Sequence, residues 1–294
     1  MTPTAIALIL LSAALHAIWN FLLKRSGGGQ DVVALSKLSE AVVFAPVFLL
    51  FFAPSLPRSM AVLTLTSFAA LGVLANYVLL AKAYRHGDLS FVYPTSRGAI
   101  LFFLPIVGFL AMRERISPLG LAALAAIVTG IVTLNLESLT LASVRRLRSA
   151  FASRASTYAL LAGLVAAVYT IWDKYSIRQL QPFAYMYLYT AMVAAAYGAW
   201  LFARRPRAGI AVTWRMSWPS IIAIGVLNTT SYLLVLAALA DGVSSYVLGM
   251  RQLSIVFGVA LGWKALGEPL GAPRATGVAL ILAGCLLLSV AAVG

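Results

Sequence analysis

The sequence predicts an all-α polytopic membrane protein, with ten transmembrane helices arranged as two inverted five-helix repeats. Three observations support this prediction: the composition, the lengths of the apolar runs, and matching residues in the two halves of the chain. Of the 294 residues, 62% are hydrophobic and only 10% are charged, and the mean hydropathy is +0.95. A soluble domain carries roughly 25% charged residues. This chain therefore has too few charges to face water, and most of its surface must face lipid.

Ten apolar runs are long enough to cross a bilayer, for which a helix needs about 20 residues. The predicted spans of the first half are residues 4–23, 32–52, 61–84, 89–112 and 119–136. Those of the second half are residues 158–175, 183–203, 219–240, 243–265 and 271–293. The run 4–23 resembles a signal peptide in position, but no basic residue precedes it and no cleavage site is evident, so we interpret it as a span.

Turn residues separate the spans and divide the chain into two halves. Glycine, proline and aspartate interrupt the apolar pattern at residues 26–29, 54–57, 86–88, 241–242 and 267–269. The longest interruption is a basic connecting loop at residues 137–156. We therefore expect a first repeat at residues 1–136 and a second, inverted repeat at residues 157–294.

An internal repeat is indicated by rare residues that recur about 154 positions apart. The matched pairs are Arg97 with Arg251, Glu114 with Glu268, and Trp19 with Trp172. Because each half contains an odd number of spans, the second half would lie upside down relative to the first. Inverted repeats of this kind are typical of secondary transporters, whose substrate site lies at the repeat interface.

The formal net charge of +14 comes from Lys and Arg residues in short loops between the spans. We interpret these residues as contacts for anionic lipid headgroups, and we expect no nucleic-acid partner. Loops after odd-numbered spans hold thirteen of them and loops after even-numbered spans hold five. The positive-inside rule therefore places both termini outside the cell.

Two arginines lie inside predicted spans, where an ionised group costs about 2.5–3.5 kcal/mol at a helix centre. Arg97 lies two turns into the fourth span, and Arg251 lies at the equivalent point of the ninth. Tyr93 precedes Arg97 by one helical turn. Two guanidinium groups at one cavity would suit a carboxylate or phosphate. The alternative is that a fixed carboxylate or helix-end carbonyls neutralise each arginine.

Other polar residues of the spans are candidates for the walls of such a cavity. They are His16, Trp19 and Asn20 in the first span, Asn76 and Tyr77 in the third, Trp172 in the sixth and Tyr232 in the eighth. Such side chains also occur at lipid headgroups or in bonds between helices. For Tyr185, Tyr187 and Tyr189, we expect the headgroup belt. Glu114 and Glu268 are expected to cap the helix that follows each of them.

Glu40 is an acidic residue of the second span, three residues after Lys37. The two side chains are expected to form a structural pair on one helix face. If Glu40 instead faces the cavity, it is the candidate for carrying a coupling proton.

Several functional classes lack their usual residues in this chain. The single cysteine, Cys285, permits no internal disulfide and no cysteine cluster for a metal. No nucleotide-binding phosphate loop is present, so transport would be secondary. With two histidines and no hydrolase motif, a membrane-embedded enzyme is the weaker hypothesis, and we expect neither a metal nor a cofactor.

The motifs resemble those of the drug/metabolite transporter superfamily, specifically its ten-span EamA-type members. The motifs are residues 16–20 (HAIWN) with Lys24, Ala83-Tyr84 before residues 87–90 (GDLS), residues 92–94 (VYP), Arg97-Gly98 and residues 266–268 (LGE). The resemblance implies two inverted five-helix repeats, a central cavity and alternating access. It also implies cytoplasmic termini, which conflicts with the charge count.

We expect a secondary transporter of a small anionic or zwitterionic metabolite in the cell (inner) membrane, as a monomer or a homodimer. In phosphate-ester exchangers of the superfamily, basic residues lie on the fourth and ninth helices, and Arg97 and Arg251 match them by position. The alternative is an exporter of amines or drugs. However, cation exporters of the superfamily use a carboxylate in the first span, and this chain has none there.

Overall fold

The computed structural model describes residues 1–26, 29–87 and 89–293, and these residues form an all-helical bundle. The first half contains α1 (Pro3–Arg25), α2 (Gln30–Phe51), a 3₁₀ turn (Ala53–Ser55), α3 (Met60–His86), α4 (Leu89–Met112) and α5 (Pro118–Thr133). After α6 (Leu141–Ala150), the second half contains α7 (Arg154–Ser176), α8 (Pro182–Arg204), α9 (Arg207–Asp241), α10 (Ser244–Arg251), α11 (Leu253–Leu266) and α12 (Ala272–Val293). Gly27, Gly28 and Asp88, which belong to two expected turns, lie outside the described residues.

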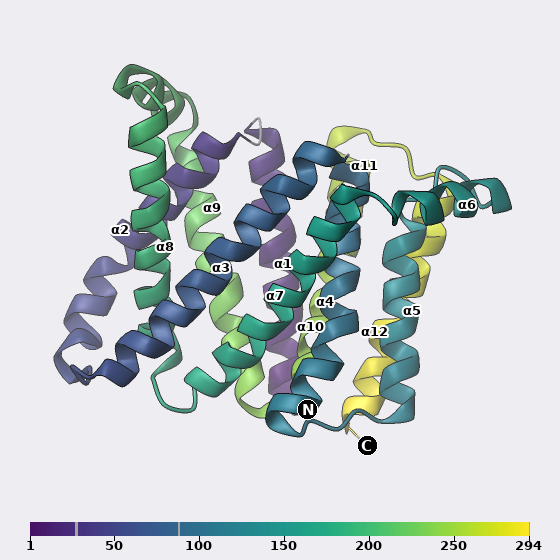
Figure 1. The fold of residues 1–294 in the computed structure, drawn as a ribbon, viewed down its shortest axis with the longest axis horizontal. Coiled ribbons are helices and arrows are strands. Elements are labelled where there is room, and N and C mark those ends of the chain that lie inside the picture. The colour runs from purple at the N-terminus through teal and green to yellow at the C-terminus, as the bar shows by residue number, and fades with distance from the viewer. Residues whose placement is uncertain (27–28, 88, 294) are drawn as a thin grey trace.

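The predicted spans are confirmed as helices. Among the described residues, nine segments are long and apolar enough to cross a membrane, and α5 is a shorter apolar helix. The helices α10 and α11 together count as one of the nine, Ser244–Ala265. Both termini lie at the same face of the bundle, as an even number of crossings requires (Figure 1). We call this face the terminal face and the other the α6 face.

Hydroxyl side chains begin several of these helices. At a helix start the first backbone N–H groups lack partners, and a side-chain oxygen satisfies one of them. Thr2, Ser59, Ser117 and Ser153 accept such bonds at the starts of α1, α3, α5 and α7. These caps fix where the spans begin.

The helix contacts are related by exchange of the two halves. Helices α3 and α4 of the first half both pack on α7 of the second half. Conversely, α9 and α11 of the second half both pack on α1 of the first half. The helices α2 and α8 pair at one edge, and α5 and α12 pair at the other (Figure 1). This arrangement is consistent with an inverted five-helix repeat, which stays a prediction.

Three features of the structure differ most from the sequence prediction. The segment 137–156 is not only a loop, because it contains the ten-residue helix α6 at the edge of the α6 face (Figure 1). The helix α9 begins at Arg207, twelve residues before its predicted start, and continues through Pro219. The ninth span is broken at Gln252, just after Arg251.

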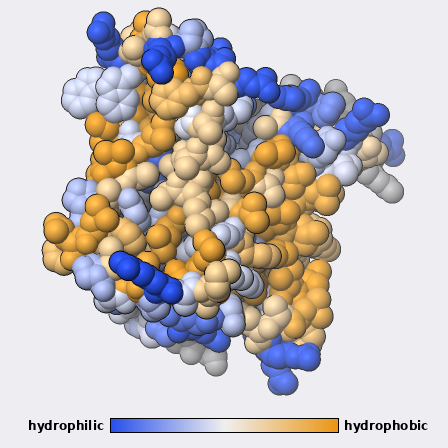
Figure 2. Space-filling model, turned by 60° about the vertical axis from the view of Figure 1, so that its left-hand side comes forward, coloured by the Kyte–Doolittle hydropathy of each residue, from blue (hydrophilic) through white to orange (hydrophobic). Residues whose placement is uncertain are grey.

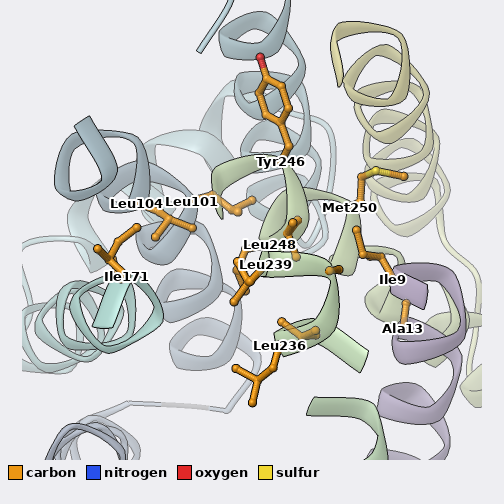
Figure 3. Close-up of a cluster of buried hydrophobic side chains, with 14 of the residues drawn as sticks. Ile9, Ala13, Leu101, Leu104, Ile171, Leu236, Leu239, Tyr246, Leu248 and Met250 are labelled. Carbon is orange, nitrogen blue, oxygen red and sulfur yellow. The ribbon is translucent and has the colours of Figure 1, made fainter. Parts of the chain in front are cut away.

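Hydrophobic side chains fill the interior and also cover the outer surface between the two polar ends. A buried cluster joins α1, α4, α7, α9 and α10 (Figure 3). Large apolar side chains such as Val42, Leu50 and Leu110 are more than two-thirds exposed, and Figure 2 shows apolar residues across the middle of the molecule. Lipid is the solvent that suits such a surface.

The pair formed by α5 and α12 depends on a glycine contact that can be tested. A Cβ atom on Gly130 would lie 2.7 Å from the backbone oxygen of Gly277, whereas a Cβ on Gly258 would meet nothing within 4 Å. We expect Gly130→Ala to lower stability by about 1–3 kcal/mol, because backbone must move. Gly258→Ala is the control and should be neutral or stabilising by up to about 1 kcal/mol. Thermal unfolding in detergent measures both, and equal effects would contradict the close packing of α5 on α12.

Candidate functional site

Three of the predicted site residues meet at the centre of the bundle. His16 on α1 lies between Arg97 on α4 and Arg251 at the end of α10. The Nη2 atom of Arg97 lies 3.4 Å from His16 Nε2, and the Nη2 atom of Arg251 lies 3.1 Å from His16 Nδ1. The two pseudo-equivalent arginines therefore approach opposite nitrogens of one imidazole ring.

Each arginine also lies over a tyrosine ring. The guanidinium carbon of Arg97 is 5.1 Å from the centre of the Tyr93 ring, and that of Arg251 is 5.4 Å from the centre of the Tyr232 ring. A guanidinium group is attracted to the face of an aromatic ring. The tyrosines thereby orient both cations without neutralising them.

More N–H donors surround His16 than the ring can accept. Trp19 Nε1 donates to His16 Nδ1 at 3.2 Å, the same nitrogen that Arg251 approaches. A neutral imidazole accepts a hydrogen bond at one nitrogen only, and arginine and tryptophan side chains are donors only. The Nε atom of Arg251 is buried and has no hydrogen-bond partner, and no salt bridge among the described residues includes either arginine. The centre of the site therefore has a surplus of donors and of positive charge.

The remaining predicted wall residues divide into two groups. Asn20 lies beside the centre and donates to the backbone oxygen of His16 at 2.7 Å. The other three bond or pack between helices: Asn76 donates to Ala162 O, Tyr77 packs edge-on against Tyr197, and Trp172 donates to Leu65 O. The structure does not bring these three to His16.

Glu40 is buried in a separate cluster on α2 and α9. Its Oε2 atom accepts a hydrogen bond from Lys37 Nζ at 2.8 Å, and Asn228 Nδ2 lies 3.4 Å from both carboxylate oxygens. These contacts confirm the predicted pair with Lys37, which is the structural alternative for Glu40.

One buried carboxylate was not among the predicted site residues, and it shares the partner Tyr232 with Arg251. Asp173 on α7 is 2% exposed and accepts hydrogen bonds from Tyr185 Oη at 2.6 Å and from Tyr232 Oη. The prediction that Tyr185 and Tyr189 belong to a headgroup belt is wrong, because both side chains are buried. The spacing of Tyr169, Trp172 and Asp173 matches that of His16, Trp19 and Asn20, and this repeated pattern is the sequence feature that could have identified Asp173.

The helix α4, which carries Arg97, and the helix α11, which follows Arg251 and the break at Gln252, end in the same backbone motif. The residue that follows each helix has a left-handed conformation, with φ of 56° at Arg113 and 66° at Gly267. The next residue is a glutamate whose N–H donates to a glycine carbonyl six positions earlier: Glu114 to Gly108 and Glu268 to Gly262. Only glycine adopts this conformation without strain, so the strain falls on Arg113 in the first half.

The two glutamates have different surroundings. At the terminal face, Glu114 is buried: it accepts a bond from Lys174 Nζ at 2.5 Å and bonds from Ser244 N and Oγ at the start of α10. The expectation that Glu114 caps the helix following it is wrong, because it caps α10 of the other half. At the α6 face, Glu268 pairs with Lys24 and Arg274 in a largely exposed cluster. The hydrogen bond from Lys24 lowers the pKa of Glu268.

A surface pocket of about 410 Å³ opens at the terminal face and is lined by Arg115, Asp241 and Tyr246, among others. Neither arginine of the central site lines it. Within the described residues, no three His, Cys, Asp or Glu side chains are placed to hold a metal ion.

The two glutamate pairs allow a matched test of burial. We expect Lys174→Met to lower stability by about 3–5 kcal/mol, because it leaves Glu114 buried without a cation. Lys24→Met removes one of the two cations beside Glu268, whose side chain is 30% exposed and keeps Arg274, and should cost no more than about 1 kcal/mol. Thermal unfolding of the two purified variants in detergent compares them. Similar losses in both would show that the terminal-face pair is not effectively buried.

Comparisons with known proteins agree with the fold and the motifs. Residues 153–290 match the profile of the EamA-like transporter family. A solved crystal structure, described only as that of a protein, superposes with a TM-score of 0.77 over 99% of this chain and 98% of that chain, at 14% identity, which shows the fold alone. A comparison with curated proteins found no match. The second half of the chain is thus similar to an EamA-like transporter domain, and the chain is a multi-pass integral membrane protein.

Proposed function

We propose that this protein transports a small anionic or zwitterionic metabolite by secondary, alternating-access transport, with Arg97 and Arg251 binding the carboxylate or phosphate-type group. The substrate would bind beside His16, between the two halves of the bundle. Movement of one half against the other would expose the site to each side of the membrane in turn.

One observation carries this proposal, the surplus of donors around His16. Arg97, Arg251 and Trp19 all direct N–H groups at one imidazole, which accepts at a single nitrogen. Two guanidinium groups this close to a shared ring also repel one another. An anion with several acceptor oxygens would satisfy the unused donors and offset the charge.

The neighbouring residues would shape this site. Tyr93 and Tyr232 hold the guanidinium groups against their rings, and Asn20 ties its side chain to the backbone of His16. Glu40, the coupling candidate by sequence, is paired with Lys37 away from this centre. Its contacts favour a structural role that connects α2 to α9.

A thermal-shift panel on the purified full chain in detergent tests the anion site. The probes are lactate and glycerol 3-phosphate (anionic), alanine (zwitterionic), glucose (neutral) and choline (cationic). A ligand at 100 times its dissociation constant stabilises a protein by about 2.7 kcal/mol. We expect stabilisation by an anionic or zwitterionic probe, and its loss in Arg97→Gln, because a hydrogen bond to a charged group contributes about 1.5–3 kcal/mol.

The matched control is Arg215→Gln, which removes an exposed arginine of α9 and should leave the stabilisation unchanged. Uptake of the stabilising probe into proteoliposomes then tests transport itself. Stabilisation by choline alone, unaltered in Arg97→Gln, would make the arginines structural and favour transport of amines. Binding without any flux would contradict a transport function.

A further inference from the structure

A third buried carboxylate, Asp173, differs from Glu40 and Glu114 in pairing with no cation among the described residues. Buried Glu40 and Glu114 each pair with a lysine, Lys37 and Lys174 respectively. Asp173 forms no salt bridge within the described part of the chain, and its two hydrogen bonds come from tyrosine hydroxyls. An uncompensated charge inside a membrane protein is expensive and is a mark of function.

The tyrosine partners suit both the charged and the neutral form of Asp173. A hydroxyl group can donate a hydrogen bond or accept one by rotating about its C–O bond. Tyr185 and Tyr232 can therefore both donate to a carboxylate, and one of them can accept from the protonated acid. A proton can thus bind and leave without a change in packing.

The groups that face Asp173 are mostly neutral and come from every helix around it. They are Tyr185 and Tyr189 on α8, Tyr232 on α9, and Tyr169 on its own helix. The adjacent Lys174 is directed to Glu114 and to Gly242 O. Farther along lie Arg97 on α4, Arg251 on α10 and Tyr77 on α3, all of which interact with Tyr169.

Tyr232 connects Asp173 to the proposed anion site. Its ring lies 5.4 Å from the guanidinium carbon of Arg251, while its hydroxyl donates to Asp173. A negative Asp173 opposes an anion at Arg251, and a protonated Asp173 does not. Binding of the anion and of the proton therefore favour each other, and this coupling is reciprocal.

We propose that Asp173 is the proton-binding residue of this transporter, and that it takes up a proton together with the anion held by Arg97 and Arg251. The binding of the anion by Arg97 and Arg251 rests on the proposed function. The proton adds to a carboxylate oxygen of Asp173 when the site faces one side of the membrane, and returns to water when the site faces the other.

Infrared difference spectroscopy of the purified full chain, titrated from alkaline to acidic pH without ligand, tests the proton site. We expect a band of a protonated carboxylic acid that is lost in Asp173→Asn and kept in Glu40→Gln. Tyr232→Phe, which removes one hydrogen bond, should shift that band, and it serves as the second variant if Asp173→Asn does not fold. A band that survives in Asp173→Asn, or that Tyr232→Phe leaves unmoved, would overturn the proposal.

The coupling is tested with lactate and alanine, whose charges do not change between about pH 5.5 and 8. In wild type, their affinity should fall as pH rises, by at most about tenfold per pH unit for one proton. In Asp173→Asn, which stays neutral, affinity should be independent of pH. A titrating band combined with pH-independent affinity in wild type would overturn coupling. If no probe stabilises the wild-type protein, the proposal that the arginines bind an anion is wrong. The infrared titration still tests proton binding at Asp173, because it is done without a ligand.

Discussion

Charged side chains inside this bundle need partners within the protein, because lipid offers none. Two buried glutamates meet this requirement with lysines, Glu40 with Lys37 and Glu114 with Lys174. Among the described residues, Arg97, Arg251 and Asp173 form no salt bridge, and Tyr232 touches the last two of them. Lys37 and Glu40 lie on one helix, whereas Lys174 on α7 reaches Glu114 of the first half. In the proposed function, the charges without such a partner bind a solute and a proton. On this proposal, pairing separates structural charges from functional ones more clearly than position in a span does.

The relation between the halves is clearest where α4 and α11 end. Both helices stop with a left-handed residue and turn a glutamate back over a glycine of the same helix. The local sequence thus builds the same turn twice, and only the surroundings differ. At the terminal face the glutamate reaches across to α7 and α10, and at the α6 face it remains in contact with water.

Much of the fold and part of the site could be predicted from the sequence. Apolar run length predicted every span, and the recurrence of Arg97 at Arg251 predicted that the two would converge. Hydropathy could not predict which helix face meets which neighbour. For that reason Trp172 was assigned to the cavity although it bonds to α3, and Tyr185 was assigned to the headgroups although it is buried against Asp173. The break at Gln252 was also missed, since no proline or glycine marks it.

The unequal burial of the two glutamates has an energetic consequence for the exchange between conformations. Opening the terminal face would separate Glu114 from Lys174 and require water to replace a buried pair, whereas opening the α6 face would separate groups that water already reaches. Two halves related by the predicted inverted repeat would otherwise give two nearly equal populations. In the proposed transport cycle, the different burial of the two pairs would make the two states unequal in free energy. A bound solute must then offset the free-energy difference between the two states by binding more tightly to the less populated one.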